Sequence, residues 1–229
     1  MGRLSTLIVE QARESIITDG WSILDNDTKP AKALLKSGTG SILNYQKNQI
    51  DEALSYVKKF DCAIDGGANY GFITYHLHQF KQVHAFEFYA PVSECLEKNV
   101  VHFNMSNTQV HHCGLGQKNK KVSVSKRTTF GNHVHPTDTG DVNIIPLDSL
   151  ELDACDFIKL DCEGYESFIL RGALETISKF KPVILMECTK LSDQYYGITK
   201  ETQINILLKQ GYQILKQFNK DIIMGPIWQ

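Results

Sequence analysis

The segment DCAIDGGANYGFITY, residues 61–75, limits the folds open to this chain more than any other feature. In it an apolar run ends in an acid, breaks into glycines and is followed by a new apolar pattern. A glycine-rich turn between a first strand and a helix is typical of doubly wound α/β folds, where it holds a nucleotide-like cofactor at the carboxyl edge of the sheet. The segment therefore predicts a fold class together with a kind of ligand.

The sequence after this turn supports the α/β class. Short β-rich runs alternate with amphipathic segments, which predicts parallel strands joined by crossover helices. The expected strands cover residues 61–65, 82–87, 108–112, 155–161 and 182–187, and the expected helices cover 70–78, 91–103, 164–179 and 200–209. The closing YQILKQFNKDIIMG predicts an antiparallel hairpin that turns at Asn219-Lys220.

The middle of the chain departs from this alternation. KVSVSK at 121–126 and DVNIIPLD at 141–148 have apolar residues at every second position, and together they predict a hairpin. The stretch between them is long and polar, so we expect it to form a loop that covers a substrate.

Two parts are expected along the chain. Near the N-terminus, apolar residues recur at helical spacing, at Leu4, Leu7, Ile8, Ala12 and Ile16. This pattern predicts a helical cap over residues 1–44. Residues 45–229 are expected to form one α/β domain, because no linker or internal repeat divides them.

Charge and composition narrow the class of partner. The chain has 24 Lys and Arg against 26 Asp and Glu, so it lacks the basic field that draws in nucleic acid or anionic membranes. It has no apolar run near the roughly 20 residues that cross a bilayer, and no secretory signal pattern. The six cysteines include no C-x-x-C pair, which favours reduced thiols. We therefore expect a cytoplasmic protein with a small-molecule partner, without nucleic acid or membrane.

The spacing of the glycine-rich turn distinguishes between cofactors. Dinucleotide folds have G-x-G-x-x-G around a pyrophosphate, whereas this turn reads D-x-G-x-N-x-G over Asp65, Gly67, Asn69 and Gly71. An acid at the start of the turn would repel a pyrophosphate but suits S-adenosylmethionine, which carries an ammonium, a sulfonium and no phosphate. Gly67 permits close backbone approach, and asparagine tolerates a left-handed conformation.

Two further segments fit the same cofactor. Glu87 follows Asp65 by 22 residues at the end of the strand VHAFEF, where a carboxylate can accept hydrogen bonds from both ribose hydroxyls. The alternative is that both acids simply cap the helices that follow. After the third strand, Cys113-Gly114-Leu115-Gly116 can clasp the adenine. The expected cofactor contacts are Asp65, Gly66, Gly67, Ala68, Asn69, Gly71, Glu87, Phe88, Gly114, Leu115 and Asp161.

Several of these motifs together resemble one known family. IDGGANYG, AFEFYAPVSECLEKNVVHFN, HHCGLG, PLDSL, DFIKLDCEGYESFILRGA and ILMEC are similar to the FkbM-type S-adenosylmethionine-dependent methyltransferases. The resemblance covers residues 45–215, and its most specific element is D-x-E-G-x-E after the I-K strand. It implies a Rossmann-like class I methyltransferase fold, whose seven-stranded, mostly parallel sheet has an antiparallel last strand. It also implies methylation of a hydroxyl on a sugar or natural product.

The chain departs from the family pattern in two places. EFYAP stands where the family has E-P-x-P, which leaves cofactor binding intact. The loop 127–140 has no motif that aligns, so the resemblance does not identify the acceptor.

Candidate catalytic groups gather at the ends of two expected strands. Asp161 and Glu163 follow one strand and Glu187 ends the next, so parallel pairing brings the three carboxylates to one edge. One reading makes Asp161 the base or the group that orients the acceptor. The other makes the trio a Mg²⁺ site, and we favour the metal-free reading. Glu166 is interpreted as a first-turn acid that complements the dipole of its helix.

Two loop histidines offer a second base. His133 and His135 lie in the long polar loop and can titrate near neutral pH. The expected catalytic groups are thus Asp161, Glu163, His133 and His135. Two other functions stay open, a dinucleotide-dependent oxidoreductase and a non-catalytic S-adenosylmethionine-binding module.

Overall fold

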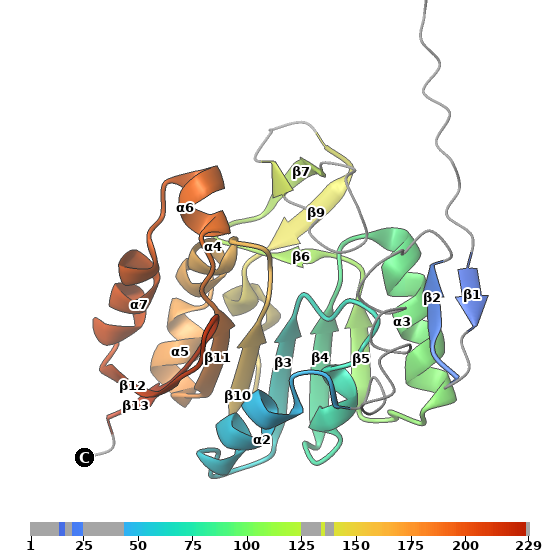
Figure 1. Cartoon of the computed structure of the whole chain (residues 1–229), viewed down its shortest axis with the longest axis horizontal. Helices are drawn as coiled ribbons and strands as arrows, with labels where there is room; N and C mark the ends of the chain where they lie inside the picture. Colours follow the sequence, from blue (N-terminus) through green and yellow to red (C-terminus); the bar gives the residue numbers. More distant parts are fainter. Residues whose placement is uncertain (1–13, 17–19, 25–43, 125–133, 136–139, 228–229) are drawn as a thin grey trace, which may run out of the picture.

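A seven-stranded sheet runs through the centre of the computed structural model, which describes residues 14–16, 20–24, 44–124, 134–135 and 140–227 (Figure 1). The strand order is β12-β13-β11-β10-β3-β4-β5. The strands are β3 Cys62–Gly66, β4 Gln82–Phe86, β5 Thr108–His111, β10 Phe157–Leu160, β11 Val183–Glu187, β12 Tyr212–Gln217 and β13 Asp221–Pro226.

The strand directions confirm the doubly wound α/β class. β5, β4, β3, β10 and β11 pair in parallel, whereas β13 is antiparallel to both β11 and β12. The last strand is therefore the antiparallel one, as the family resemblance implies. Helices on both sides bury the sheet. Ile158 of β10 packs in the layer with α4 Glu166–Arg171, α5 Leu174–Phe180 and α7 Lys200–Leu208, and its neighbour Phe157 packs in the layer with α2 Lys47–Ser55.

The helices agree with the sequence pattern in part. They are α2 Lys47–Ser55, α3 Ala90–His102, α4 Glu166–Arg171, α5 Leu174–Phe180, α6 Leu191–Tyr196 and α7 Lys200–Leu208, with short 3₁₀ turns η2 Thr74–Leu77 and η3 Leu147–Leu150. Among the described helices, none has both the length and the apolar character needed to cross a bilayer.

Two expected helices are corrected. The helix expected over 70–78 is only the turn η2, because Asn69 and Gly71 take left-handed φ angles of 52° and 89° that interrupt a regular helix. The helix expected over 164–179 is divided into α4 and α5 near Gly172. A Cβ at Gly172 would overlap the carbonyl oxygen of Gly116, so the break lets the two backbones meet.

The middle of the chain forms a second, four-stranded sheet in the order β6-β9-β7-β8. Its strands are β6 Gly114–Leu115, β7 Lys120–Val124, β8 Val134–His135 and β9 Val142–Ile145. β7 and β9 are antiparallel, which confirms the expected pairing, but β8 from within the expected loop also pairs with β7. The arrowheads of the central parallel strands point toward this small sheet (Figure 1). Most of the polar loop lies outside the described residues, so its covering role stays a prediction.

The described part of the N-terminal region is extended rather than helical. β1 Glu14–Ile16 pairs in an antiparallel manner with β2 Ser22–Leu24. Residues 1–13, 17–19 and 25–43 of the expected cap lie outside the described part. Trp21 is 1% exposed and packs against Phe72 and Phe103. Asn99 of α3 accepts from the Ser22 amide and donates to the Ser22 carbonyl. This segment thus belongs to the same packed core as α3.

Candidate active site

A cavity of about 510 Å³ opens at the carboxyl edge of the parallel strands. It collects residues from the glycine-rich turn, the ends of β4, β10 and β11, and the small sheet. Ten residues singled out in the sequence line it: Gly67, Ala68, Asn69, Glu87, Phe88, Gly114, Leu115, Asp161, Glu163 and Glu187. The structure therefore brings most of the expected cofactor contacts together with three of the expected acidic groups.

The glycine-rich turn has the backbone shape that its sequence suggests. Gly67 has φ 78° and Asn69 has φ 52°, both in the left-handed region. The amides of Gly67 and Ala68 both donate to the carbonyl of Phe86, which fixes the turn against β4. A Cβ at Gly67 would overlap the carbonyl oxygen of Asp161. Position 67 must therefore be glycine so that the turn can contact the end of β10. The spacing of the glycine-rich turn alone does not reveal this reason.

Asp65 is corrected from a cofactor contact to a buried support. It is 0% exposed, is not among the cavity residues, and accepts a hydrogen bond of 2.6 Å from the Thr74 hydroxyl. Burial raises the pKa of its carboxyl. Gly66 and Gly71 also lie behind the cavity wall, where a Cβ would press on Leu160 and Leu96 respectively.

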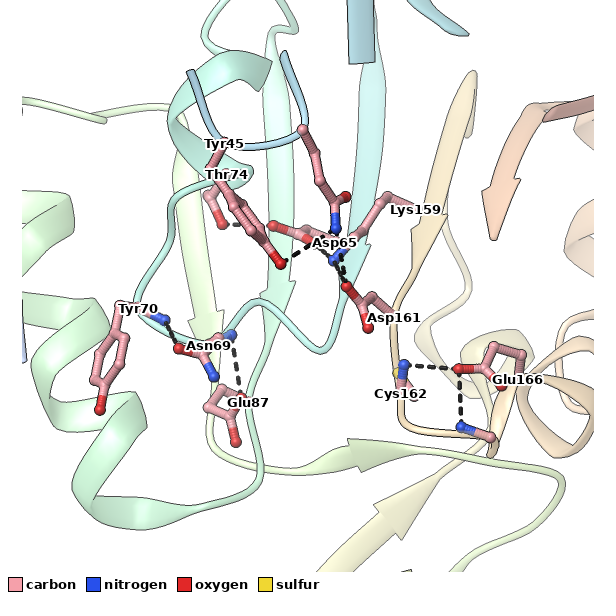
Figure 2. A network of polar contacts seen from close by, with 12 residues as sticks. Tyr45, Asp65, Asn69, Tyr70, Thr74, Glu87, Lys159, Asp161, Cys162 and Glu166 are labelled. Atoms are coloured by element: carbon pink, nitrogen blue, oxygen red, sulfur yellow. Dashed lines mark hydrogen bonds and ion pairs between the residues drawn. The ribbon is translucent and has the colours of Figure 1, made fainter. Parts of the chain in front are cut away.

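Lys159 is a site residue that the sequence reasoning missed. Its ammonium lies 3.7 Å from Asp65 Oδ1 and 3.7 Å from Asp161 Oδ2, between the two carboxylates (Figure 2). The side chain is 4% exposed and reaches the cavity wall. Burial lowers the pKa of Lys159, but Asp161 and Asp65 more than offset this and raise it above its ordinary value. The sequence does contain a signal for Lys159, which is a lysine inside the apolar strand DFIKLD. A charge buried in such a strand requires partners, so this lysine points to a charged cluster.

Asp161 connects this charged cluster to the N-terminal side of the cavity. Its Oδ2 accepts from Gln46 Nε2 at 3.4 Å, and the same amide nitrogen lies 3.3 Å from the Tyr45 hydroxyl (Figure 2). Burial raises the pKa of Tyr45, and the charge of Asp161 adds to the effect. Tyr45 lines the cavity, yet nothing in its local sequence distinguishes it from a packing aromatic.

Glu87 is placed as a ribose-binding carboxylate would need to be. It is 8% exposed, lines the cavity, and accepts from the backbone amides of Asn69 at 3.1 Å and Tyr89 at 2.8 Å. Burial raises its pKa to about 7, and the backbone donors oppose that rise. Each carboxylate oxygen holds one of these bonds and keeps a lone pair for another donor.

The D-x-E-G-x-E block folds into a tight loop that Glu166 organises. The Glu166 carboxylate accepts from the amides of Cys162 at 2.8 Å and Gly164 at 3.2 Å (Figure 2). Glu163 and Gly164 have φ angles of 53° and 96°. Burial raises the pKa of Glu166 to about 7. Glu166 does lie in the first turn of α4, as expected, but its side chain is buried and also shapes the loop that carries Glu163.

The Mg²⁺ alternative finds no support in the geometry. Asp161, Glu163 and Glu187 do line one cavity. Within the described residues, however, no group of three His, Cys, Asp or Glu side chains is arranged to hold a metal ion. The positive charge beside Asp161 comes from Lys159 instead.

The loop histidines cannot be placed in the site. His133 lies outside the described residues. The backbone of His135 belongs to β8 and pairs with Ser123 of β7. A catalytic role for either histidine stays a prediction.

Comparisons with known proteins agree with this arrangement. The family described as "Methyltransferase FkbM domain" matches residues 65–214. No curated protein matches the sequence. The structure of methyltransferase FkbM from Methylobacillus flagellatus KT is similar at 18% identity and a TM-score of 0.50, covering 80% of this chain and 52% of that one. This chain thus spans about half the length of that protein.

A second solved structure has the same fold. The putative rRNA-methylase from Clostridium thermocellum is similar at 10% identity with a TM-score of 0.50, covering 78% of this chain and 92% of that one. At such low identities, these two likenesses concern the fold.

Proposed function

The chain belongs to the FkbM methyltransferase family, and from that premise we propose that it methylates a hydroxyl of a sugar or small natural product. The family is S-adenosylmethionine-dependent and has the class I fold. The observation that carries the proposal is one cavity that joins the glycine-rich turn and Glu87 to the acidic end of β10. The nearly equal numbers of acidic and basic residues support a small acceptor rather than nucleic acid.

The cavity residues on and around the glycine-rich turn fit the cofactor. Glu87 has lone pairs for the two ribose hydroxyls, and Phe88 and Leu115 provide apolar surface for adenine. Gly67 and Asn69 line the same cavity, where the surface of the turn can contact the methionine portion. When bound, S-adenosylmethionine supplies an electrophilic methyl group on a sulfonium.

The residues around Asp161 fit a hydroxyl acceptor. Lys159 and Gln46 hold the Asp161 carboxylate at the cavity wall, where it can accept a hydrogen bond from the acceptor. Because methyl transfer is an in-line displacement, such positioning of the acceptor oxygen supplies much of the rate. We propose that Glu163 helps to shape the same space, and that His133 or His135 contributes from the loop.

Binding of S-adenosylhomocysteine tests the cofactor assignment. We expect it to raise the thermal midpoint of the chain in a concentration-dependent way, whereas NAD should leave the midpoint unchanged. Stabilisation by NAD alone would favour the oxidoreductase function. Release of S-adenosylhomocysteine during a screen of methyl glycosides and polyhydroxylated natural products would distinguish an enzyme from a binding module.

Replacing Glu87 with glutamine is expected to weaken S-adenosylhomocysteine binding by about 10- to 100-fold. The amide loses the charge that strengthens hydrogen bonds from the ribose hydroxyls. Isothermal calorimetry measures the change. Glu94→Gln, on an exposed position of α3, is the matched control and should bind as the parent does. Equal affinity in Glu87→Gln and the parent would remove the ribose assignment.

Replacing Asp161 with asparagine is expected to lower kcat by about 10- to 100-fold on an acceptor found in the screen. The asparagine is a weaker acceptor for the substrate hydroxyl, and it leaves Lys159 with one carboxylate instead of two. Affinity for S-adenosylhomocysteine should stay within about threefold of the parent, since cofactor contacts come mainly from other residues. Steady-state kinetics would refute the assignment if the variant kept full kcat.

A further inference from the structure

Glu187 differs from the other carboxylates at the cavity. Glu87 binds two backbone amides, and Asp161 contacts Gln46 and Lys159. Glu187 ends β11, lines the cavity, and within the described residues has neither a hydrogen-bond donor nor an ion-pair partner within 4.0 Å. The carboxylate oxygens of Glu187 are therefore available to accept a hydrogen bond or a proton from a ligand in the cavity.

The sheet places this acid next to the group that positions the acceptor. β10 and β11 are parallel neighbours with Leu160 opposite Met186, so Asp161 and Glu187 follow that pair side by side at the sheet edge. Both line the same cavity. A hydroxyl held by Asp161 thus lies within the region that Glu187 faces.

Resting on the proposed function, we propose that Glu187 is the catalytic residue that takes the proton from the acceptor hydroxyl. The proton passes from the acceptor oxygen to a Glu187 carboxylate oxygen. The acceptor oxygen forms its bond to the methyl carbon as the carbon–sulfur bond breaks, with that electron pair remaining on sulfur. Glu187 then releases the proton to water, which balances the reaction.

The electrostatic surroundings suit this role. Burial raises the pKa of Glu187 to about 8, and Asp161, Glu163 and Glu166 add to the rise while Lys220 opposes it. A general base works best when its pKa lies near the working pH. The titratable and charged groups around it come from every neighbouring element: Tyr45, Asp161, Glu163, Glu166, Lys190, Lys220 and Asp221.

A pair of cofactor analogues tests the proposal without a known acceptor. Sinefungin resembles S-adenosylmethionine but carries an amine at the position of the transferred methyl group, whereas S-adenosylhomocysteine has nothing there. If Glu187 faces that position, its carboxylate should bind the ammonium of sinefungin. We expect Glu187→Gln to reduce sinefungin affinity about tenfold or more by calorimetry, and S-adenosylhomocysteine affinity by less than about twofold.

Proton release provides a second readout. At pH 7 a group with a pKa of about 8 is mostly protonated, and an adjacent ammonium lowers its pKa, so binding expels the proton. Calorimetry in buffers of different ionisation enthalpy should therefore show sinefungin releasing more protons than S-adenosylhomocysteine does. The difference should approach one proton in the parent and vanish in Glu187→Gln.

The outcomes separate this inference from the function on which it rests. Glu175→Gln, an exposed position of α5 outside the cavity, is the matched control and should behave as the parent in both readouts. The role of Glu187 would be overturned if Glu187→Gln lost affinity for both analogues equally. It would also be overturned if the variant kept the parent's ratio of sinefungin to S-adenosylhomocysteine affinity and released as many protons on binding. Failure of the parent to bind S-adenosylhomocysteine would overturn the proposed function, and this inference with it.

Discussion

Replacing Lys159 with methionine is expected to destabilise the folded chain by about 3–5 kcal/mol, the cost of removing one partner from a buried ion pair. Methionine fills much the same volume but leaves Asp65 and Asp161 without their shared positive charge. Asp65 is fully buried, and its Oδ1 has no hydrogen-bond partner among the described residues, so Lys159 is its charge compensation on that side. Urea unfolding followed by tryptophan fluorescence measures the loss.

A double variant separates charge from packing in this prediction. Lys159→Met combined with Asp65→Asn removes the buried charge that Lys159 neutralises, and should recover about half of the lost stability. Asparagine can still accept from the Thr74 hydroxyl, so that hydrogen bond is retained. A double variant no more stable than Lys159→Met would show that the lysine matters for its packing rather than for its charge.

Replacing Gly67 with valine is expected to abolish measurable S-adenosylhomocysteine binding, a loss of more than about 100-fold, and to destabilise the fold by about 3–5 kcal/mol. The residue has φ 78°, which a β-branched side chain strongly disfavours. Its Cβ would also overlap the backbone of Asp161, so the turn must move away from β10. Calorimetry and urea unfolding report the two effects.

Gly197 provides the matched control for this variant. It also has a left-handed φ, of 63°, but a Cβ there meets no atom of the described part of the chain within 4 Å. Gly197→Val therefore contains the backbone strain without the overlap, and it should cost less stability and leave cofactor binding intact. Similar losses in the two variants would show that strain, rather than the contact with Asp161, makes Gly67 necessary.

The features predicted well from the sequence are those that depend on local spacing. The turn at Gly67 and Asn69, and Glu87 at the end of the following strand, are separated by few residues and have characteristic neighbours. The mostly parallel sheet with its antiparallel last strand could also be expected, because the family resemblance implies it. These elements are enough to locate the cavity but not to describe its charges.

The contacts that the sequence did not reveal depend on strand register. Asp65 and Lys159 lie opposite each other on β3 and β10, although 94 positions separate them in the chain. A pattern of spacing contains no information on which buried groups meet across a sheet. For the same reason Asp65 was expected in the cavity, whereas it lies behind the wall and acts through Lys159.

Asn99 sets a lower limit on how far this protein can be shortened. Its side chain joins Ser22 to the Tyr70 carbonyl, and Tyr70 directly follows the left-handed Asn69 of the cofactor turn. A fragment trimmed to the family match at 65–214 would lack Ser22 and Trp21, together with β13, the antiparallel strand beside β11. The borders of sequence similarity and the borders of a stably folding unit are therefore different in this chain, and fragments for crystallisation or NMR should retain residues 20–24.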